Sequence, residues 1–315
     1  QAIKLRYLAN KHLLCLSPDS LRAFLLEDLE EQIQIHSKGS LRPPYSPATH
    51  IPRTEIWNKI QSFSEHGSHR LLPLVGPATI GKTSEIFSYI QQTLSSPGSK
   101  ALPLYIPLNL SGPDFLPFLA ENFGWALNQS MSVVSLIHDL DEIAHSQGKL
   151  CIVYILDGAD MAADNLAEVR KQIFNLIRRS SGLRCQHKIL VAAQEATWMR
   201  LVSGQSVDLS AYCEQPVHVE VLAPEQSLRH IHALESFYGI HMVRDNLPGL
   251  PAITHMRAQQ MRSAGPASVK ASDVLGKYFR WQLSKVCNSS ALLAALTRLS
   301  ARLLDEDADR LEDVP

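Results

Sequence analysis

Long apolar runs are missing from this sequence, and so is an excess of charge of either sign. The longest apolar stretches, at 150–156 (LCIVYIL) and 188–193 (KILVAA), are far too short to span a bilayer. The formal net charge of −1 and the pI near 7 provide no global field that would attract nucleic acid or an anionic membrane. We therefore expect no membrane partner, and we consider a nucleic-acid partner unlikely on charge alone.

Cysteine pairs and a secretion signal are also missing. The five cysteines are scattered and odd in number, without a CxxC pair, which favours reduced thiols over a disulfide framework. No charged start followed by an apolar segment marks export. These features predict a cytoplasmic protein. Because the chain starts with Gln and ends in an acidic, helix-like tail, we interpret it as a piece of a longer protein.

The apolar pattern predicts an α/β architecture. Strand-length apolar runs occur at 71–75, 102–108, 150–156, 188–193 and 217–222, and amphipathic helical stretches such as 84–94 and 166–177 lie between them. Unbroken apolar strands that alternate with helices indicate a mainly parallel sheet covered on both faces. From 224 onward only helical patterns remain, at 225–238, 272–286 and 290–304. We predict an N-terminal helical segment and linker (1–50), a three-layer α/β domain with a five-stranded sheet (51–223) and a helical domain (224–315).

A phosphate-binding motif follows the first predicted strand. The segment 76–83, GPATIGKT, fits G-x-x-x-x-G-K-[ST] at every fixed position. Glycines let the backbone N–H groups turn toward a phosphate, the helix that follows directs its positive end to the same anion, and lysine reaches the β- and γ-phosphates. The threonine hydroxyl is a ligand for Mg²⁺. The predicted nucleotide-binding residues of this loop are Gly76, Pro77, Ala78, Thr79, Ile80, Gly81, Lys82, Thr83 and Ser84.

A carboxylate at the end of the third predicted strand completes this site. Asp157 follows seven mostly apolar residues, and we expect it to hold, through water, the Mg²⁺ of a bound nucleotide that Thr83 also contacts. A turn-forming role for Asp157 before Gly158 is the alternative. Asp160 is a candidate for orienting or deprotonating an attacking water, and capping of the next helix is its alternative. Lys82, Asp157 and Asp160 are thus the predicted catalytic residues.

Together, these residues resemble the STAND class of signalling NTPases, which includes the NACHT and NB-ARC modules. GPATIGKT and ILDGAD, with no Glu directly after Asp157, are similar to the class motifs. The segment 50–63, HIPRTEIWNKIQSF, resembles its opening element, and 106–124 resembles its second strand and following helix. The segment 246–251, NLPGLP, resembles the G-x-P motif of its helical lid. The resemblance extends over about residues 50–310.

The resemblance implies a switch that binds ADP or ATP with Mg²⁺ between the α/β domain and a helical lid. It implies that Arg53 and Pro251 flank the base or ribose, and that exchange of ADP for ATP drives self-association. Sensor and effector domains would lie outside this chain. The alternative roles are a surface charge before a helix for Arg53 and a helix breaker for Pro251.

The chain departs from the class pattern after the fourth strand, where an arginine often senses the γ-phosphate. Here Gln194 occupies this position, so sensing there is weaker or is done by another arginine such as Arg200. With no Glu beside Asp157 we expect a slow ATPase. Adenine is favoured because no guanine-reading motif is visible.

Two other functions stay open. One is an AAA+ ATPase associated with nucleic acid, such as a transposition or loading factor, and the other is a P-loop domain that binds nucleotide only as a structural element. His230 and His232 suggest a metal site, but residues two apart on a helix point in different directions. We therefore expect both histidines on the surface.

Overall fold

The computed structural model describes residues 18–37, 45–96, 98–127, 130–203, 207–242 and 250–264. The chain divides into two compact units, one with the bounds Gln1–Ile33 and Pro52–Glu220, the other with the bounds Gln34–Ile51 and Val221–Pro315. None of the helices among the described residues is long and apolar enough to cross a bilayer.

The first unit is built on a parallel sheet of five strands. In spatial order they are β2 (Ala101–Pro107), β3 (Cys151–Asp157), β4 (Gln186–Ala193), β1 (Leu71–Val75) and β5 (Val217–His218). All residues of β1 and β3 are buried, as expected for strands covered on both faces. This confirms the α/β fold predicted from the apolar runs.

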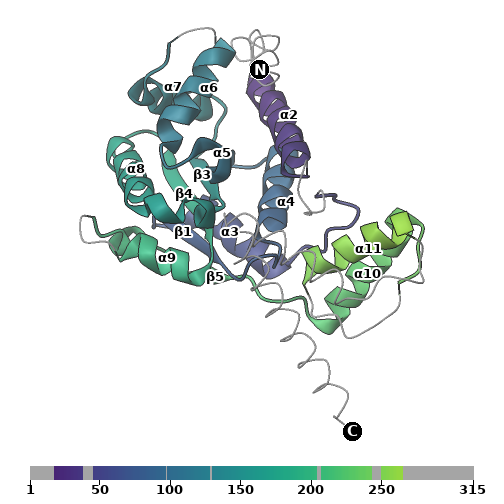
Figure 1. Ribbon diagram of the computed structural model, residues 1–315. Coiled ribbons are helices and arrows are strands. Elements are labelled where there is room, and N and C mark those ends of the chain that lie inside the picture. The colour runs from purple at the N-terminus through teal and green to yellow at the C-terminus, as the bar shows by residue number, and fades with distance from the viewer. Residues whose placement is uncertain are drawn as a thin grey trace. The chain divides into compact units, whose positions relative to one another are not determined.

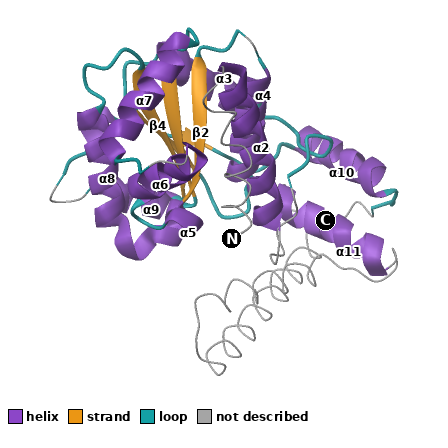
Figure 2. Cartoon of the chain, turned by 90° about the horizontal axis from the view of Figure 1, so that it is seen from above, coloured by secondary structure: helices purple, strands orange, loops and turns teal. Residues whose placement is uncertain are grey.

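Helices form the two outer layers. Figures 1 and 2 show α3 (Thr54–His66) and α4 (Lys82–Ser95) on one face of the sheet, and α7 (Val133–Ser146) and α8 (Leu166–Arg179) on the other. The apolar face predicted for α8 is buried, and it consists of Leu166, Val169, Ile173, Leu176 and Ile177. The remaining elements of this unit are α2 (Pro18–Ser37, which extends beyond the unit), α5 (Leu108–Ser111), α6 (Phe115–Leu127), η1 (Ala159–Asn165), α9 (Glu195–Val202) and η2 (Ser210–Tyr212).

The last strand is shorter than predicted. The apolar run 217–222 suggested six residues, but β5 ends at His218. Its neighbour β1 ends at Val75, whose carbonyl accepts a last hydrogen bond from the Val219 N–H at 2.7 Å. Beyond that point β1 turns away into the phosphate-binding motif, so the edge strand has no partner to continue its ladder.

The regular elements that lie wholly within the second unit are, among its described residues, helices. It contains α10 (Pro224–Tyr238) and α11 (Pro251–Ala264), whose core consists of Ile231, Leu234, Met242, Ala258 and Met261. The predicted helices at 272–286 and 290–304 lie outside the described residues. His230 is buried, contrary to the prediction, because its ring contacts the carbonyls of Thr49 and Pro251 at 2.8 and 3.2 Å. The predicted exposure of His232 is correct.

Candidate nucleotide-binding site

The phosphate-binding motif joins the carboxyl end of β1 to the first turn of α4. Gly76 follows Val75 directly, and a Cβ atom at this position would lie 2.6 Å from the Val219 carbonyl oxygen. Gly81, the residue before α4, has a φ of 102°, which an L side chain rarely adopts. Both glycines of the motif are therefore required by the backbone, and Lys82 and Thr83 become the first two residues of the helix.

Thr79, between the two glycines, is the one non-glycine residue with positive φ in the described part of the chain, at 66°. A β-branched residue in this region carries a backbone strain of about 1–2 kcal/mol. Thr79→Gly should remove this strain, and the greater flexibility of glycine in the unfolded chain offsets only part of the gain. We expect the substitution to raise the melting temperature by roughly 1–4 °C, as measured by calorimetry. Thr79→Val, which retains the strain, should produce no increase, and a lower melting temperature for Thr79→Gly would contradict the assignment.

The Lys82 side chain curls back over the loop. Its Nζ donates hydrogen bonds to the carbonyl oxygens of Gly76 and Pro77 at 2.6 and 2.8 Å. Pro77 and Ala78 are exposed, Ile80 is buried, and Thr83 and Ser84 are partly exposed at the start of α4. The ammonium group, the first N–H groups of α4 and the Thr83 hydroxyl thus occur together in one loop, and these groups fit a polyphosphate and its cation.

Asp157 lies at the same edge of the sheet. It is the last residue of β3, and β4 lies between β3 and β1. Since all five strands are parallel, the carboxyl ends of β1 and β3 open on one edge, where ligands of such sheets bind. Asp157 is buried, and its Oδ2 accepts a hydrogen bond from the Tyr105 hydroxyl on β2 at 2.9 Å. This hydrogen bond fixes the carboxylate.

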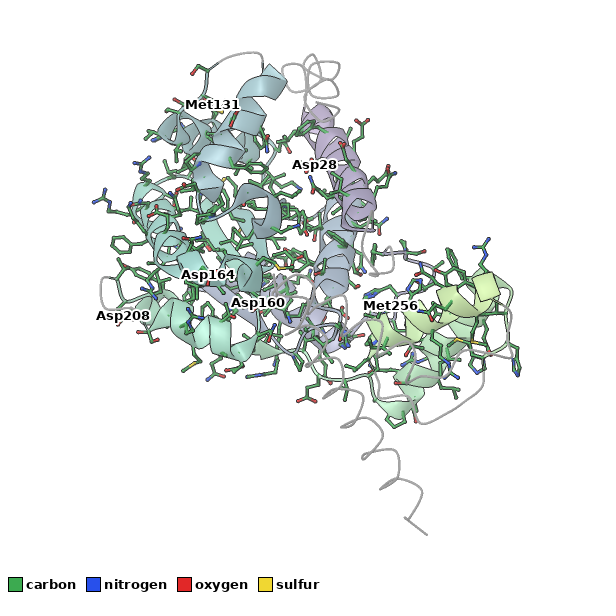
Figure 3. All side chains as sticks on the ribbon, in the orientation of Figure 1. Asp28, Met131, Asp160, Asp164, Asp208 and Met256 are labelled. Atoms are coloured by element: carbon green, nitrogen blue, oxygen red, sulfur yellow. The ribbon has the colours of Figure 1, made fainter. Side chains whose placement is uncertain are left out.

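Asp160 is tied to the residue that follows β4. It lies on η1, and Figure 3 labels it. Its two carboxylate oxygens accept the backbone N–H of Gln194 at 2.9 and 3.2 Å. Gln194 immediately precedes α9 and is itself exposed. The loop after β3 and the loop after β4 are therefore joined at the edge where the phosphate-binding motif lies.

The residues predicted to flank a base or ribose belong to different units. Arg53, just before α3, is buried, and its guanidinium group forms an ion pair with Glu85 of α4 at 2.7 Å. Pro251 begins α11 of the second unit, where its carbonyl contacts the His230 ring. Arg200 donates a hydrogen bond to the Ala163 carbonyl at 3.1 Å.

Sequence reasoning missed three interactions, which involve Tyr105, Glu85 and the pair of Glu195 and His218. Tyr105 could have been found only from the strand register, which aligns Pro107 with Asp157. The partnership of Glu85 with Arg53 spans 32 positions and leaves no local signal in the sequence. Glu195 and His218 form an exposed pair at 3.7 Å.

Comparisons with known proteins found similar solved structures but no matching family model or curated protein. Among solved structures, a Walker-type ATPase of Pyrococcus abyssi is similar at 14% identity and a TM-score of 0.55, with 84% of this chain and 81% of that chain covered. The ORC1 protein of Aeropyrum pernix, solved in complex with DNA, is similar at 14% identity and a TM-score of 0.50, with coverages of 78% and 70%.

At this level of identity the likeness concerns the fold. The parallel sheet and surrounding helices match the architecture of the Walker-type ATPase, and the motif of residues 76–83 follows the first strand as in P-loop proteins generally. The chain therefore has the α/β fold of a P-loop NTPase.

Proposed function

We propose that this chain binds ATP and ADP with Mg²⁺ at the carboxyl edge of its sheet. The observation that carries the proposal is the convergence of the 76–83 loop and Asp157 at one edge, although 74 positions separate Thr83 from Asp157 in the sequence. In the proposal, Lys82 and the loop N–H groups bind the phosphates, and Thr83 and Asp157 hold the Mg²⁺, which would neutralise phosphate charge. Arg53 and Pro251 remain the proposed neighbours of the base or ribose, and Gln194 the proposed residue near the γ-phosphate.

Asp157→Asn tests the metal role. Because the Tyr105 hydroxyl can still donate to the amide oxygen, the fold should persist while one anionic oxygen is lost. We expect Mg²⁺ to raise the affinity of the unchanged protein for ATP by about tenfold or more and that of the variant by less than about threefold. Titrations with Mg²⁺ and with EDTA measure this, and Asp164→Asn on η1, an exposed acid, is the matched control. An unchanged Mg²⁺ effect in Asp157→Asn would contradict the assignment.

We further propose that the chain acts as an AAA+ type ATPase associated with nucleic acid. The sequence resemblance favoured a STAND signalling switch, and we now place that function second. Support comes from the similar solved structures, of which one is described as a Walker-type ATPase and one was solved in complex with DNA. The near-neutral net charge argues against strong binding to the phosphate backbone of DNA by charge alone. We therefore expect DNA binding to require ATP.

Binding of a labelled DNA duplex, measured by fluorescence anisotropy, tests this proposal. The protein with Mg²⁺-ATP should bind the duplex more tightly than the protein with Mg²⁺-ADP, and affinity should fall as salt rises from about 50 to 200 mM. Lys82→Ala should abolish the difference between ATP and ADP. Equal or absent binding of the duplex in all nucleotide states would overturn the nucleic-acid assignment and leave nucleotide binding itself untouched.

A STAND-like switch remains the second candidate, and one observation favours it. Gly158 follows Asp157, so no carboxylate stands directly after it, and the carboxylate of Asp160 is held by the Gln194 N–H. We expect ATP turnover well below about one per second, an ordinary rate for enzymes. Tightly bound ADP and self-association upon exchange for ATP, seen by light scattering, would favour this candidate. A faster turnover would count against it.

A further inference from the structure

Arg53 lies where the chain passes from one unit to the other. The chain changes unit at Ile51 and Pro52, one residue before Arg53, and again at Glu220 and Val221. These two junctions are 169 positions apart in the sequence. Arg53 nevertheless connects them, because it follows the first junction directly in the chain and its side chain donates a hydrogen bond to the Glu220 carbonyl at the second.

The guanidinium group of Arg53 makes three contacts inside the first unit. Its Nη1 donates to the carboxylate of Glu85 at 2.7 Å, and its Nη2 donates to the carbonyl oxygens of Ile80 at 2.9 Å and Glu220 at 3.1 Å. Ile80 belongs to the phosphate-binding loop, and Glu85 belongs to the first turn of α4. One side chain thus joins that loop and its helix to the last residue before the second junction.

The same junction is also packed against the beginning of the loop. The Val219 N–H donates to the Val75 carbonyl at 2.7 Å, and the Val219 carbonyl leaves no room for a Cβ at Gly76. Residues 219–220 therefore contact the loop at its start, through Val75 and Gly76, and near its end, through Arg53 and Ile80. A displacement of the loop backbone by a bound phosphate would be passed to this segment directly.

The chemistry of these contacts requires arginine in particular. Arg53 and Glu85 are both buried, with side-chain exposures of 10% and 3%, so the pair is desolvated and each charge depends on the other. The planar fork of the guanidinium reaches a carboxylate and two carbonyls at once, which the single ammonium of lysine does not reproduce. An ion pair alone would hold α3 to α4, whereas the fork adds the loop and the junction.

Resting on the proposed nucleotide binding, we propose that Arg53 is a positioning residue that transmits occupancy of the phosphate-binding loop to both junctions between the units. Nucleotide bound at the loop would order residues 50–53 and 219–222 through the contacts of Arg53 with Ile80 and Glu220.

Hydrogen exchange of the full 315-residue chain, followed by mass spectrometry, tests this coupling. Mg²⁺-ATP should slow exchange in the loop (76–84) and, by about tenfold, in the two junction segments. Arg53→Lys retains a charge beside Glu85 but loses the fork, so the loop should remain protected while the junction response falls below about twofold. Arg170→Lys is the matched control, because Arg170 is also buried and donates to the carbonyls of Arg200 and Leu201, away from both junctions.

A second variant covers the case in which Arg53→Lys does not fold. Replacing both partners, as Arg53→Met with Glu85→Met, leaves no unpaired buried charge and should also separate loop protection from junction protection. A junction response that survives in both variants would overturn the inference, and so would an unchanged junction in the original protein whose loop is protected. If ATP protects no part of the original protein, nucleotide binding itself is refuted and the inference falls with it.

Discussion

Lys82→Ala is expected to lower the affinity for Mg²⁺-ATP and Mg²⁺-ADP by about 100-fold or more. The ammonium group would make two charge-assisted hydrogen bonds to phosphate oxygens, each worth about 1.5–3 kcal/mol. In the structure this group donates to the carbonyls of Gly76, which is half-buried, and Pro77, which is exposed, so its loss should change folding little. Titration calorimetry with both nucleotides measures the effect.

The control for this prediction is a lysine that lies outside the phosphate-binding loop. Lys171 lies exposed on α8 and pairs with Glu168 at 3.2 Å, three positions earlier on the same helix. Lys171→Ala should leave both nucleotide affinities within about twofold, since exposed pairs contribute little. A Lys82→Ala variant that binds as tightly as the original protein would show that the 76–83 loop is not the phosphate site.

Acidification is expected to destabilise the first unit before its carboxylates titrate. His187 of β4 is buried between Asp141 of α7 and Tyr154 of β3, with ring nitrogens 3.3 Å from Asp141 Oδ1 and 3.1 Å from the Tyr154 hydroxyl. This arrangement suits a neutral ring that donates to Asp141 and accepts from Tyr154. Burial lowers the pKa of His187 from 6.5 to about 4 and outweighs the opposing effect of Asp141.

The sign of the effect follows from this lowered pKa. In the unfolded chain His187 gains its proton near pH 6.5, but in the folded chain only near pH 4, so the stability present above pH 6.5 is lost as the pH falls toward 4. Between pH 7.5 and 5 the loss is about 2 kcal/mol.

Urea unfolding at both pH values, with and without His187→Gln, isolates this contribution. The glutamine variant should be less stable at pH 7.5 because the packing and both hydrogen bonds change, but its stability should vary less with pH. The comparison of slopes separates the titration from the cost of the substitution. An equal pH dependence in the two proteins would show that His187 does not carry the effect.

The local parts of the fold and site could be predicted from sequence. The sheet could be predicted because most of its strands contain a continuous apolar run, and β1 was predicted with its observed bounds, Leu71–Val75. The 76–83 loop and the helix from Lys82 follow from glycine positions that the backbone requires, at Gly76 and Gly81. Such features depend on neighbours in the sequence, so one sequence suffices to find them.

The parts that depend on distant neighbours could not be predicted. Asp141 falls in a stretch, 138–144, that has the pattern of a solvated helix face, yet it is buried because it accepts the N–H groups of Arg184 and Cys185. The burial of His230 likewise depends on the carbonyls of Thr49 and Pro251. These partners are distant in the sequence, and no periodicity records them.

The STAND resemblance rested partly on the segment 246–251, of which 246–249 lie outside the described residues. The AAA+ proposal rests on similarity of fold, which many P-loop proteins share. Only the chemistry at the 76–83 loop is common to both candidates, and for that reason nucleotide binding is the central claim.

The most direct test of this claim is to denature the purified protein and to identify any released nucleotide by chromatography, beside Lys82→Ala prepared in the same way. We predict ADP or ATP at about one molecule per chain when the protein is purified with Mg²⁺ and nucleotide, and none above background from the variant. An original protein that releases no nucleotide and retains none after incubation with Mg²⁺-ATP would contradict the account.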